Sequence, residues 1–306
     1  MQLDHTRIAI RERGLLETID LALHVTREFA GPLAICALLG ILPLALVNYA
    51  LVGWMTPTDL DEGAFPWRYL WNMTVLVYLE VPLASIPIVA WLGPAVFLEQ
   101  RTVRQVLGDA FRFAPQLMLS QLLIRGVLIA WLLFLVVDRM EVNWFVEGFL
   151  MVVLILYSTA MRAFRPYINE IILLEKNPLR SKNTGAITIG KRSSHLHGPY
   201  SGDLMVRWLG AASIALMLVG LALFTVVVVQ GVLLNDWPAA WDGYEVVWNL
   251  DGFKLQIVYP GCLWLVVSFM AVVRFLSYLD LRIRHEGWEV ELFMRAEALR
   301  LAARME

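Results

Sequence analysis

The chain has 306 residues, of which 59% are hydrophobic and 17% are charged, and its formal net charge is −2. Soluble domains average about 45–50% apolar and about 25% charged residues, so this composition indicates an integral membrane protein. A weakly acidic chain lacks the bulk positive charge that holds nucleic acids, so we expect no nucleic-acid partner. The two cysteines, Cys36 and Cys262, fall at different depths of predicted spans, so we expect two buried free thiols.

Residues 1–30 are expected to form an N-terminal cytoplasmic or interfacial helix. Leu15, Leu16, Ile19 and Leu23 form an apolar stripe, and charged side chains surround it. This pattern fits a helix on the membrane surface and also a cytoplasmic helix packed on other protein. The segment does not resemble a cleavable signal, because the apolar run begins only at Gly31 and no small-x-small site follows it closely.

Six apolar runs follow, each close to or above the ~20 residues that cross a bilayer core. The sequence therefore predicts an all-α polytopic membrane protein with one membrane domain at residues 31–276. The second run contains Pro82, Pro87 and Pro94, so we expect a bent or broken span. The predicted spans are 31–54, 70–98, 116–137, 145–165, 204–234 and 255–276.

Amphipathic elbow helices are predicted at one membrane face. In the first elbow, Val103, Val106, Leu107 and Ala110 recur at helical spacing, with basic residues on the other side. The second elbow begins at Pro166 and leads into the most polar stretch, residues 176–203. The chain closes with a C-terminal cytoplasmic amphipathic helix at residues 277–306.

The distribution of lysine and arginine predicts the orientation. If both termini and both elbows are cytoplasmic, about 21 of the 25 basic residues lie at the inner side, whereas Arg68, Arg139 and Lys254 lie outside and Arg125 lies deep within a span. We therefore predict a multi-pass protein with cytoplasmic N- and C-termini.

Two charges lie deep inside predicted spans, Glu80 and Arg125. At 1.5 Å per residue, both fall about 15–18 Å from the outer ends of their spans. A lone charge at this depth costs at least about 2.5–3.5 kcal/mol on insertion scales, so we predict that they form an intramembrane ion pair. Such a pair serves either as a gate or ion-coupling site or as a structural bridge.

Basic residues gather after the fourth span, and we predict that they contact the membrane interface or lipid headgroups. At the end of the fourth span, Arg162 and Arg165 either anchor the helix by snorkelling or bind a substrate, whereas the basic elbow could hold anionic lipid headgroups. Positive-inside bias alone also accounts for them. The residues are Arg162, Arg165, Lys176, Arg180, Lys182, Lys191 and Arg192.

No chemical motif of an enzyme stands out. His195 and His197 have no nearby set of cysteines or carboxylates, so we predict neither a metal site nor a cofactor. The acidic loop at residues 235–251 lacks the order of an EF-hand. No nucleophile elbow, zinc-protease or phosphate-loop pattern is present, and we predict no catalytic residues.

The tail contains an aromatic-x-Asp-x-Arg-x-Arg-x-Glu-Gly run from Tyr278 to Gly287. This pattern either docks a cytoplasmic partner or packs on the protein's own elbows. The candidate docking residues are Asp280, Arg282, Arg284, Glu286 and Trp288.

This tail, with the second elbow, resembles the membrane domain of bacterial glycerophosphoryl diester phosphodiesterases and its stand-alone relatives of unknown function. The similarity covers mainly residues 160–292. In those enzymes a separate soluble barrel carries the catalytic residues, and the predicted spans leave no room for one here. The resemblance therefore implies a bacterial inner-membrane scaffold without catalytic residues.

Two functions follow from these observations. The first is a non-catalytic membrane scaffold or subunit that organises protein partners, a second copy of itself, or anionic lipids. The alternative is a small transporter or permease subunit that uses Glu80 and Arg125.

Overall fold

The computed structural model describes residues 11–56, 65–96, 102–136, 144–179, 187–242, 245–248, 250, 252 and 254–287. Three of the predicted site residues, Trp288, Arg180 and Lys182, lie outside the described residues. The fold is all-α and polytopic, as predicted. A short antiparallel hairpin of β1 (Ala239–Asp242) and β2 (Glu245–Trp248) joins two long helices.

The helices follow the order of the predicted runs. Those of the first half are α1 (Leu15–Glu28), α2 (Ala30–Val52), α3 (Trp67–Ala84), α4 (Ile86–Val96), α5 (Val103–Arg112), α6 (Ala114–Met118) and α7 (Val127–Val136). Those of the second half are α8 (Trp144–Phe164), α9 (Ile168–Leu174), α10 (Ile189–His197), α11 (Ser201–Leu234) and α12 (Tyr259–Glu286). Short 3-10 and π segments extend α2 and α12 and join α6 to α7.

Five helical stretches are long and apolar enough to cross a membrane: Ala30–Met55, Trp67–Val96, Phe145–Phe164, Ser201–Leu234 and Lys254–Glu286. A sixth consists of Ala114–Ile124 and Val127–Val136, which are bent by 57°. Between them, Gly126 has a φ of +78°, a conformation that glycine adopts without strain. The described part therefore has five candidate spans, or the predicted six if the bent pair is one span.

The last span differs from its prediction. α12 continues as one helix through the domain boundary predicted at residues 276 and 277, and it ends only at Gly287 with a φ of +64°. The charged residues from Asp280 to Glu286 therefore lie on the last turns of a long apolar helix.

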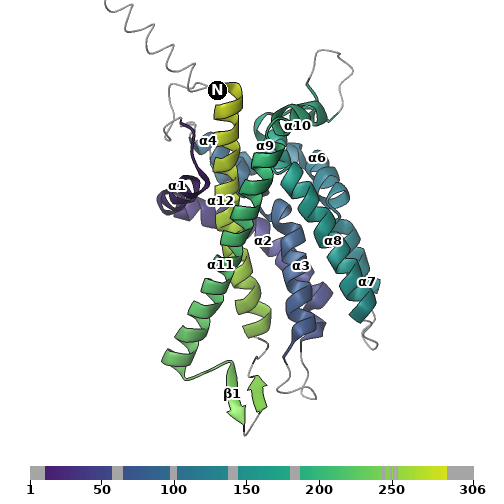
Figure 1. The fold of residues 1–306 in the computed structure, drawn as a ribbon, viewed down its shortest axis with the longest axis vertical. Helices are drawn as coiled ribbons and strands as arrows, with labels where there is room; N and C mark the ends of the chain where they lie inside the picture. Colours follow the sequence, from purple (N-terminus) through teal and green to yellow (C-terminus); the bar gives the residue numbers. More distant parts are fainter. Residues whose placement is uncertain are drawn as a thin grey trace, which may run out of the picture.

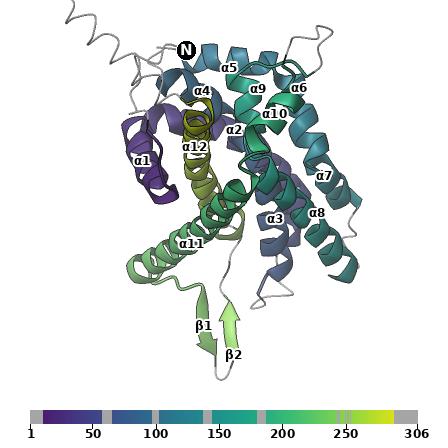
Figure 2. The ribbon, with the colours of Figure 1, turned by 45° about the horizontal axis from the view of Figure 1, so that its top comes forward.

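The two ends of the bundle differ in character. Helices α5, α9 and α10 lie at the same end as the last turns of α12, and we call this the elbow end (Figures 1 and 2). The β1–β2 hairpin lies at the opposite end, which we call the hairpin end (Figure 1). This arrangement places the two predicted elbows on one side of the protein.

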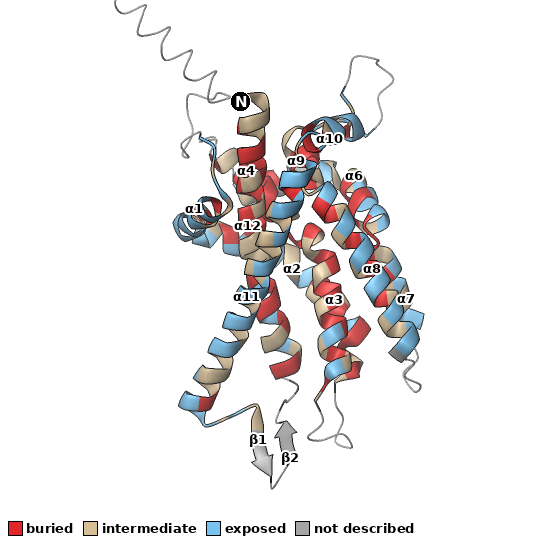
Figure 3. Cartoon of the chain, viewed as in Figure 1, coloured by how far each residue is buried: buried red, intermediate tan, exposed pale blue. Residues whose placement is uncertain are grey.

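The span Trp67–Val96 is the centre of the bundle. Of its most apolar window, 78% is buried, whereas none of the corresponding window of α11 is buried (Figure 3). Exposed apolar side chains such as Leu216 and Phe224 cover α11, as expected of a helix surrounded by lipid.

Buried apolar residues form two separate cores. The core at the elbow end contains Ile171 and Phe275, and the other contains Leu76 and Leu263. The central span is broken at Ser85, between these two sections. Near this break the buried residues are largely polar or charged, and we call this region the polar layer: Ser85, Gln121, Arg125, Arg162, Asn169 and Glu170.

Helix α1 packs on the bundle through a face next to the predicted stripe, so both predicted settings of this helix stay open. It contacts α12 and buries Thr18, Ala22 and Val25, whereas Leu16 and Leu23 of the predicted stripe are exposed. The first elbow helix α5 has the amphipathic character predicted for it, because Val106 is buried and Arg104 and Arg112 are exposed.

Candidate functional site

Glu80 is completely buried in α3, but its partners are neutral. Asn48 Nδ2 donates a hydrogen bond to Glu80 Oε2 at 2.7 Å, and Trp131 Nε1 donates to Glu80 Oε1 at 2.7 Å. The predicted Glu80–Arg125 ion pair is wrong. Both residues lie in the described part of the chain, and each has other partners. Equal depth in neighbouring spans does not by itself bring two side chains together, and these two side chains point to different neighbours.

Arg125 lies at the bend between α6 and α7. It is buried, and its Nη2 donates to the backbone carbonyl of Arg165 at 3.1 Å. Arg125 interacts electrostatically with Arg162 and Arg274, which repel it, and with Glu170, which attracts it. The acid near Arg125 is therefore Glu170, and sequence reasoning did not identify it.

Arg162 is buried rather than anchored at the surface. Its Nη2 donates to the carbonyls of Tyr78 and Leu79, and its guanidinium lies 4.1 Å from the centre of the Tyr78 ring. Pro82 has no N–H, so the Tyr78 carbonyl lacks its usual helical donor. The predicted interfacial role of Arg162 is therefore wrong, because Arg162 is buried and donates to carbonyls of α3 next to Pro82.

A chain of hydrogen bonds continues through the polar layer. Asn169 donates to the Pro82 carbonyl at 2.7 Å and accepts a hydrogen bond from Gln121. Arg274 Nε forms an ion pair with Glu170 Oε1 at 2.8 Å, and its Nη2 donates to Ser85 Oγ at 2.8 Å. α4, α9 and α12 thus meet at the break.

Several buried polar atoms of this layer have no hydrogen-bond partner within the described structure. They are Gln121 Oε1, Arg125 Nε, Ser158 Oγ, Arg162 Nε and Glu170 Oε2. Such atoms are uncommon in native proteins, and a group of them indicates a bound water, ion or ligand.

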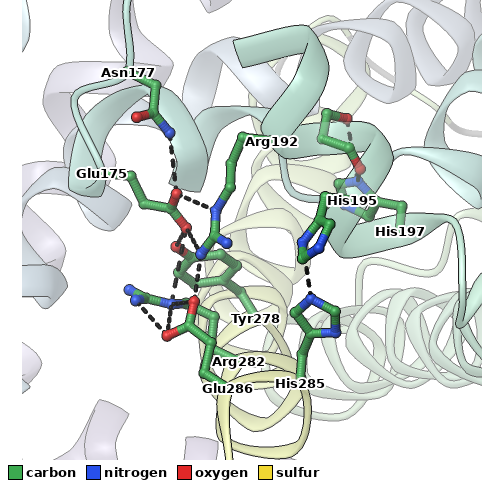
Figure 4. Close-up of polar contacts among 10 residues, drawn as sticks. Glu175, Asn177, Arg192, His195, His197, Tyr278, Arg282, His285 and Glu286 are labelled. Atoms are coloured by element: carbon green, nitrogen blue, oxygen red, sulfur yellow. Dashed lines mark hydrogen bonds and ion pairs between the residues drawn. The ribbon is translucent and has the colours of Figure 1, made fainter. Parts of the chain in front are cut away.

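At the elbow end, Arg192 joins α10 to α9 and α12 (Figure 4). Its Nε forms an ion pair with Glu175 Oε2 at 2.5 Å, and its Nη2 pairs with Glu286. Hydrogen bonding to Glu175 raises the pKa of Arg192 above its ordinary value. Its charge is therefore compensated within the protein, contrary to the predicted headgroup role. Arg165, Lys176 and Lys191 are exposed, as that role requires.

The predicted docking residues of the tail also have internal partners. Arg282 Nη2 pairs with Glu286 at 2.7 Å, and Tyr278 donates to Glu175 at 2.8 Å (Figure 4). Asp280 is buried and accepts hydrogen bonds from the backbone of Arg13 at 2.7 Å and from Arg207 at 2.9 Å. Asp280 also pairs with Arg284. The internal pairs of these four residues agree with the alternative of self-packing. Docking of a partner stays a prediction.

The histidines of the second elbow face different neighbours (Figure 4). His195 Nδ1 lies 3.1 Å from His285 Nε2, whereas His197 Nδ1 lies 2.8 Å from the Ser193 carbonyl. Burial, with Arg165 and Arg125 nearby, lowers the pKa of His197 to about 4. Among the described residues, no group of three metal-ligating side chains gathers here.

Comparison of the chain with family models, curated proteins and solved structures gives no match. The polar layer and the ion pairs of the elbow end are therefore interpreted from their own geometry.

Sequence reasoning missed several residues of these sites. Asn48, Trp131 and Asn169 are single polar or aromatic residues in apolar runs, and Glu170 and Arg274 were placed near a surface. The proline at position 82 was the available signal, because a carbonyl freed by proline requires a donor from another helix.

Proposed function

We propose that this protein is a non-catalytic scaffold of a bacterial inner membrane, with the elbow end and both termini in the cytoplasm. The observation that carries the proposal is the set of ion pairs at the elbow end. They join Arg13, α9, α10, α11 and α12 through Glu175, Asp280 and their arginine partners.

A rigid surface is suited to binding because little conformational entropy is lost when a partner docks. The ion pairs of the elbow end lie in partly buried positions, where they are screened less than surface pairs. Around them, Arg104, Phe111 and Lys191 are exposed. The positive-inside pattern and the resemblance to a membrane domain support the cytoplasmic orientation.

Site-specific photocrosslinking in cells tests the proposal. A photoreactive residue at Arg104 or Lys191 should form discrete cross-links to protein, either a partner or a second, differently tagged copy. The controls are Phe145, which is exposed on a membrane span, and Trp237, which is exposed next to β1 at the hairpin end. Absence of protein cross-links from both elbow-end positions would overturn the proposal.

A small transporter is the second candidate, and the broken spans favour it. The 57° bend beside buried Arg125 and the break beside Pro82 resemble the discontinuous helices of transporters. Because Glu80 and Arg125 do not pair, the transporter function depends on Glu80 alone. Cysteine accessibility separates the two functions, because Ser158→Cys should resist aqueous thiol reagents in a dry scaffold and react in a transporter with a water-filled path.

A further inference from the structure

The polar layer contains an excess of positive charge. Arg125 is 2% exposed, Arg162 is 8% exposed, and the Arg274 side chain is 18% exposed. Glu170 is the carboxylate that interacts with both Arg125 and Arg274. Glu80 belongs to a separate group with Asn48 and Trp131. Three guanidiniums against one carboxylate leave two positive charges uncompensated among the described residues.

Buried charge without compensation is costly, since desolvation is not repaid by an opposite charge. Carbonyls accept hydrogen bonds from Arg125 and Arg162 but carry no full negative charge. The Nε atoms of both arginines also lack partners. Within the described structure, Arg125 and Arg162 therefore lack both a compensating negative charge and an acceptor for Nε.

The position of this group fits access from the lipid headgroup region at the elbow end. Arg162 lies in the last turn of α8, and Phe164 and Arg165 directly after it are exposed. His197 on the interfacial helix α10 is close enough that Arg165 and Arg125 lower its pKa. The arginines therefore lie just beneath the elbow end.

We infer that Arg125, Arg162 and Arg274 form a binding site for a phosphate group. A guanidinium binds phosphate through paired, charge-assisted hydrogen bonds, and a phosphate oxyanion supplies both missing features. A water molecule would satisfy the Nε atoms but would leave the charge uncompensated. The inference rests on the proposed function, because an anionic phospholipid held here is one of the molecules that the scaffold organises.

The unpartnered acceptors at Gln121 Oε1 and Glu170 Oε2 specify the ligand further. A fully ionised phosphate has no donor for them, whereas a protonated phosphate oxygen or a hydroxyl next to the phosphate does. The site therefore favours a phosphomonoester, as in phosphatidic acid, or a headgroup with a free hydroxyl, as in phosphatidylglycerol.

Lipid binding is measured by native mass spectrometry of the full chain released from phosphatidylcholine nanodiscs that contain phosphatidic acid or phosphatidylglycerol. Inorganic phosphate is titrated separately, with the melting temperature as the readout. We expect bound anionic lipid on the wild-type chain and no retained phosphatidylcholine. A rise in melting temperature with inorganic phosphate alone would assign the site to free phosphate.

The test variant is Arg125→Gln, which removes a charge whose described hydrogen bond goes only to a carbonyl. We expect binding at least about tenfold weaker, as for the loss of one charge-assisted contact. Arg104→Gln on exposed α5 is the matched control, because it removes a charge from the same end and should bind as the wild type does. Arg125→Lys, with partial retention expected, serves if Arg125→Gln fails to fold.

Equal binding by the wild type and a folded Arg125 variant would overturn the inference, as would equal loss in Arg104→Gln. Elbow-end protein cross-links that persist without bound phosphate would show that the site has failed while the scaffold proposal stands.

Discussion

Pro82 explains why Arg162 is buried inside this membrane protein. A proline inside a helix leaves one carbonyl without a donor, and in lipid that carbonyl must be paired by another part of the protein. Arg162 pairs with the Tyr78 carbonyl and the neighbouring Leu79 carbonyl. The charge on α8 and the proline on α3 are therefore two parts of one structural feature.

Arg162→Met should lower the free energy of unfolding by about 1–3 kcal/mol, because it leaves buried carbonyls unpaired. The loss should be smaller in a Pro82→Ala background, where the alanine N–H pairs with Tyr78. Denaturant unfolding in detergent micelles measures both values. Arg165→Met is the control, since the exposed side chain should be replaceable at little cost. Equal losses with and without Pro82 would contradict this explanation.

His197 predicts a dependence of stability on acid pH. Its pKa is about 4 in the folded protein, compared with an ordinary value of 6.5, mainly because of burial. The unfolded chain therefore binds a proton first as pH falls. The stabilisation is complete above about pH 6.5 and is lost progressively towards pH 4, by up to about 3 kcal/mol.

Melting temperatures of the detergent-solubilised protein between pH 7 and pH 4 measure this loss. His197→Asn, whose amide can replace the contact with the Ser193 carbonyl, should flatten the profile. His24→Asn should leave it unchanged, because His24 is exposed on α1. An identical slope in wild type and His197→Asn would exclude His197 as the cause.

At the scale of elements, α2 approaches the broken central span closely at Gly40. A Cβ atom at this position would lie 2.2 Å from the Ala84 carbonyl oxygen, next to the break at Ser85. The nearest atoms belong to the backbone of Ala84, which cannot rotate away as a side chain can. Glycine at position 40 therefore sets the distance between α2 and the break.

Gly40→Ala should destabilise the protein by about 1–3 kcal/mol, the usual cost of overpacking. Gly31→Ala on the same helix meets no atom within 4 Å, so it should be neutral or slightly stabilising. Thermal unfolding of the two variants in one detergent compares them directly. A Gly40→Ala protein as stable as Gly31→Ala would show that α2 can move away.

The elements also show how far the sequence predicts the structure. Hydropathy located the spans, because lipid requires long apolar helices, and the prolines predicted that the second span is bent or broken without giving the position. The partners of Glu80 and Arg125 were not predictable in this way. Depth follows from counting residues, but the direction of a side chain depends on helix rotation, which the neighbouring helices determine.

The end of α12 illustrates the same limit. The charges after residue 276 suggested a separate cytoplasmic helix, yet those from Asp280 to Glu286 continue the last span without a break. Arg274 and Asp280 face α9 and α11 at successive turns. Charged residues near a membrane surface are tolerated inside a helix when neighbouring elements pair with them, and a single sequence does not show those neighbours.

For the whole molecule, orientation is the property from which the proposed function follows. The structure groups α5, α9 and α10 with the end of α12, so all of them must lie on one side of the membrane. The positive-inside rule predicts that this side is cytoplasmic, because most lysines and arginines belong to the termini and the two elbow regions of the sequence.

Thiol labelling of intact cells tests this orientation with little background, because the native cysteines Cys36 and Cys262 are both buried. A membrane-impermeant maleimide should label Trp237→Cys at the hairpin end and spare Lys191→Cys on α10 until the cells are opened. Trp237 and Lys191 are both exposed on the protein, so a difference in labelling reports which side of the membrane each residue faces. The reverse pattern would invert the map and place the elbow end, with its exposed Arg104 and Lys191, outside the cytoplasm.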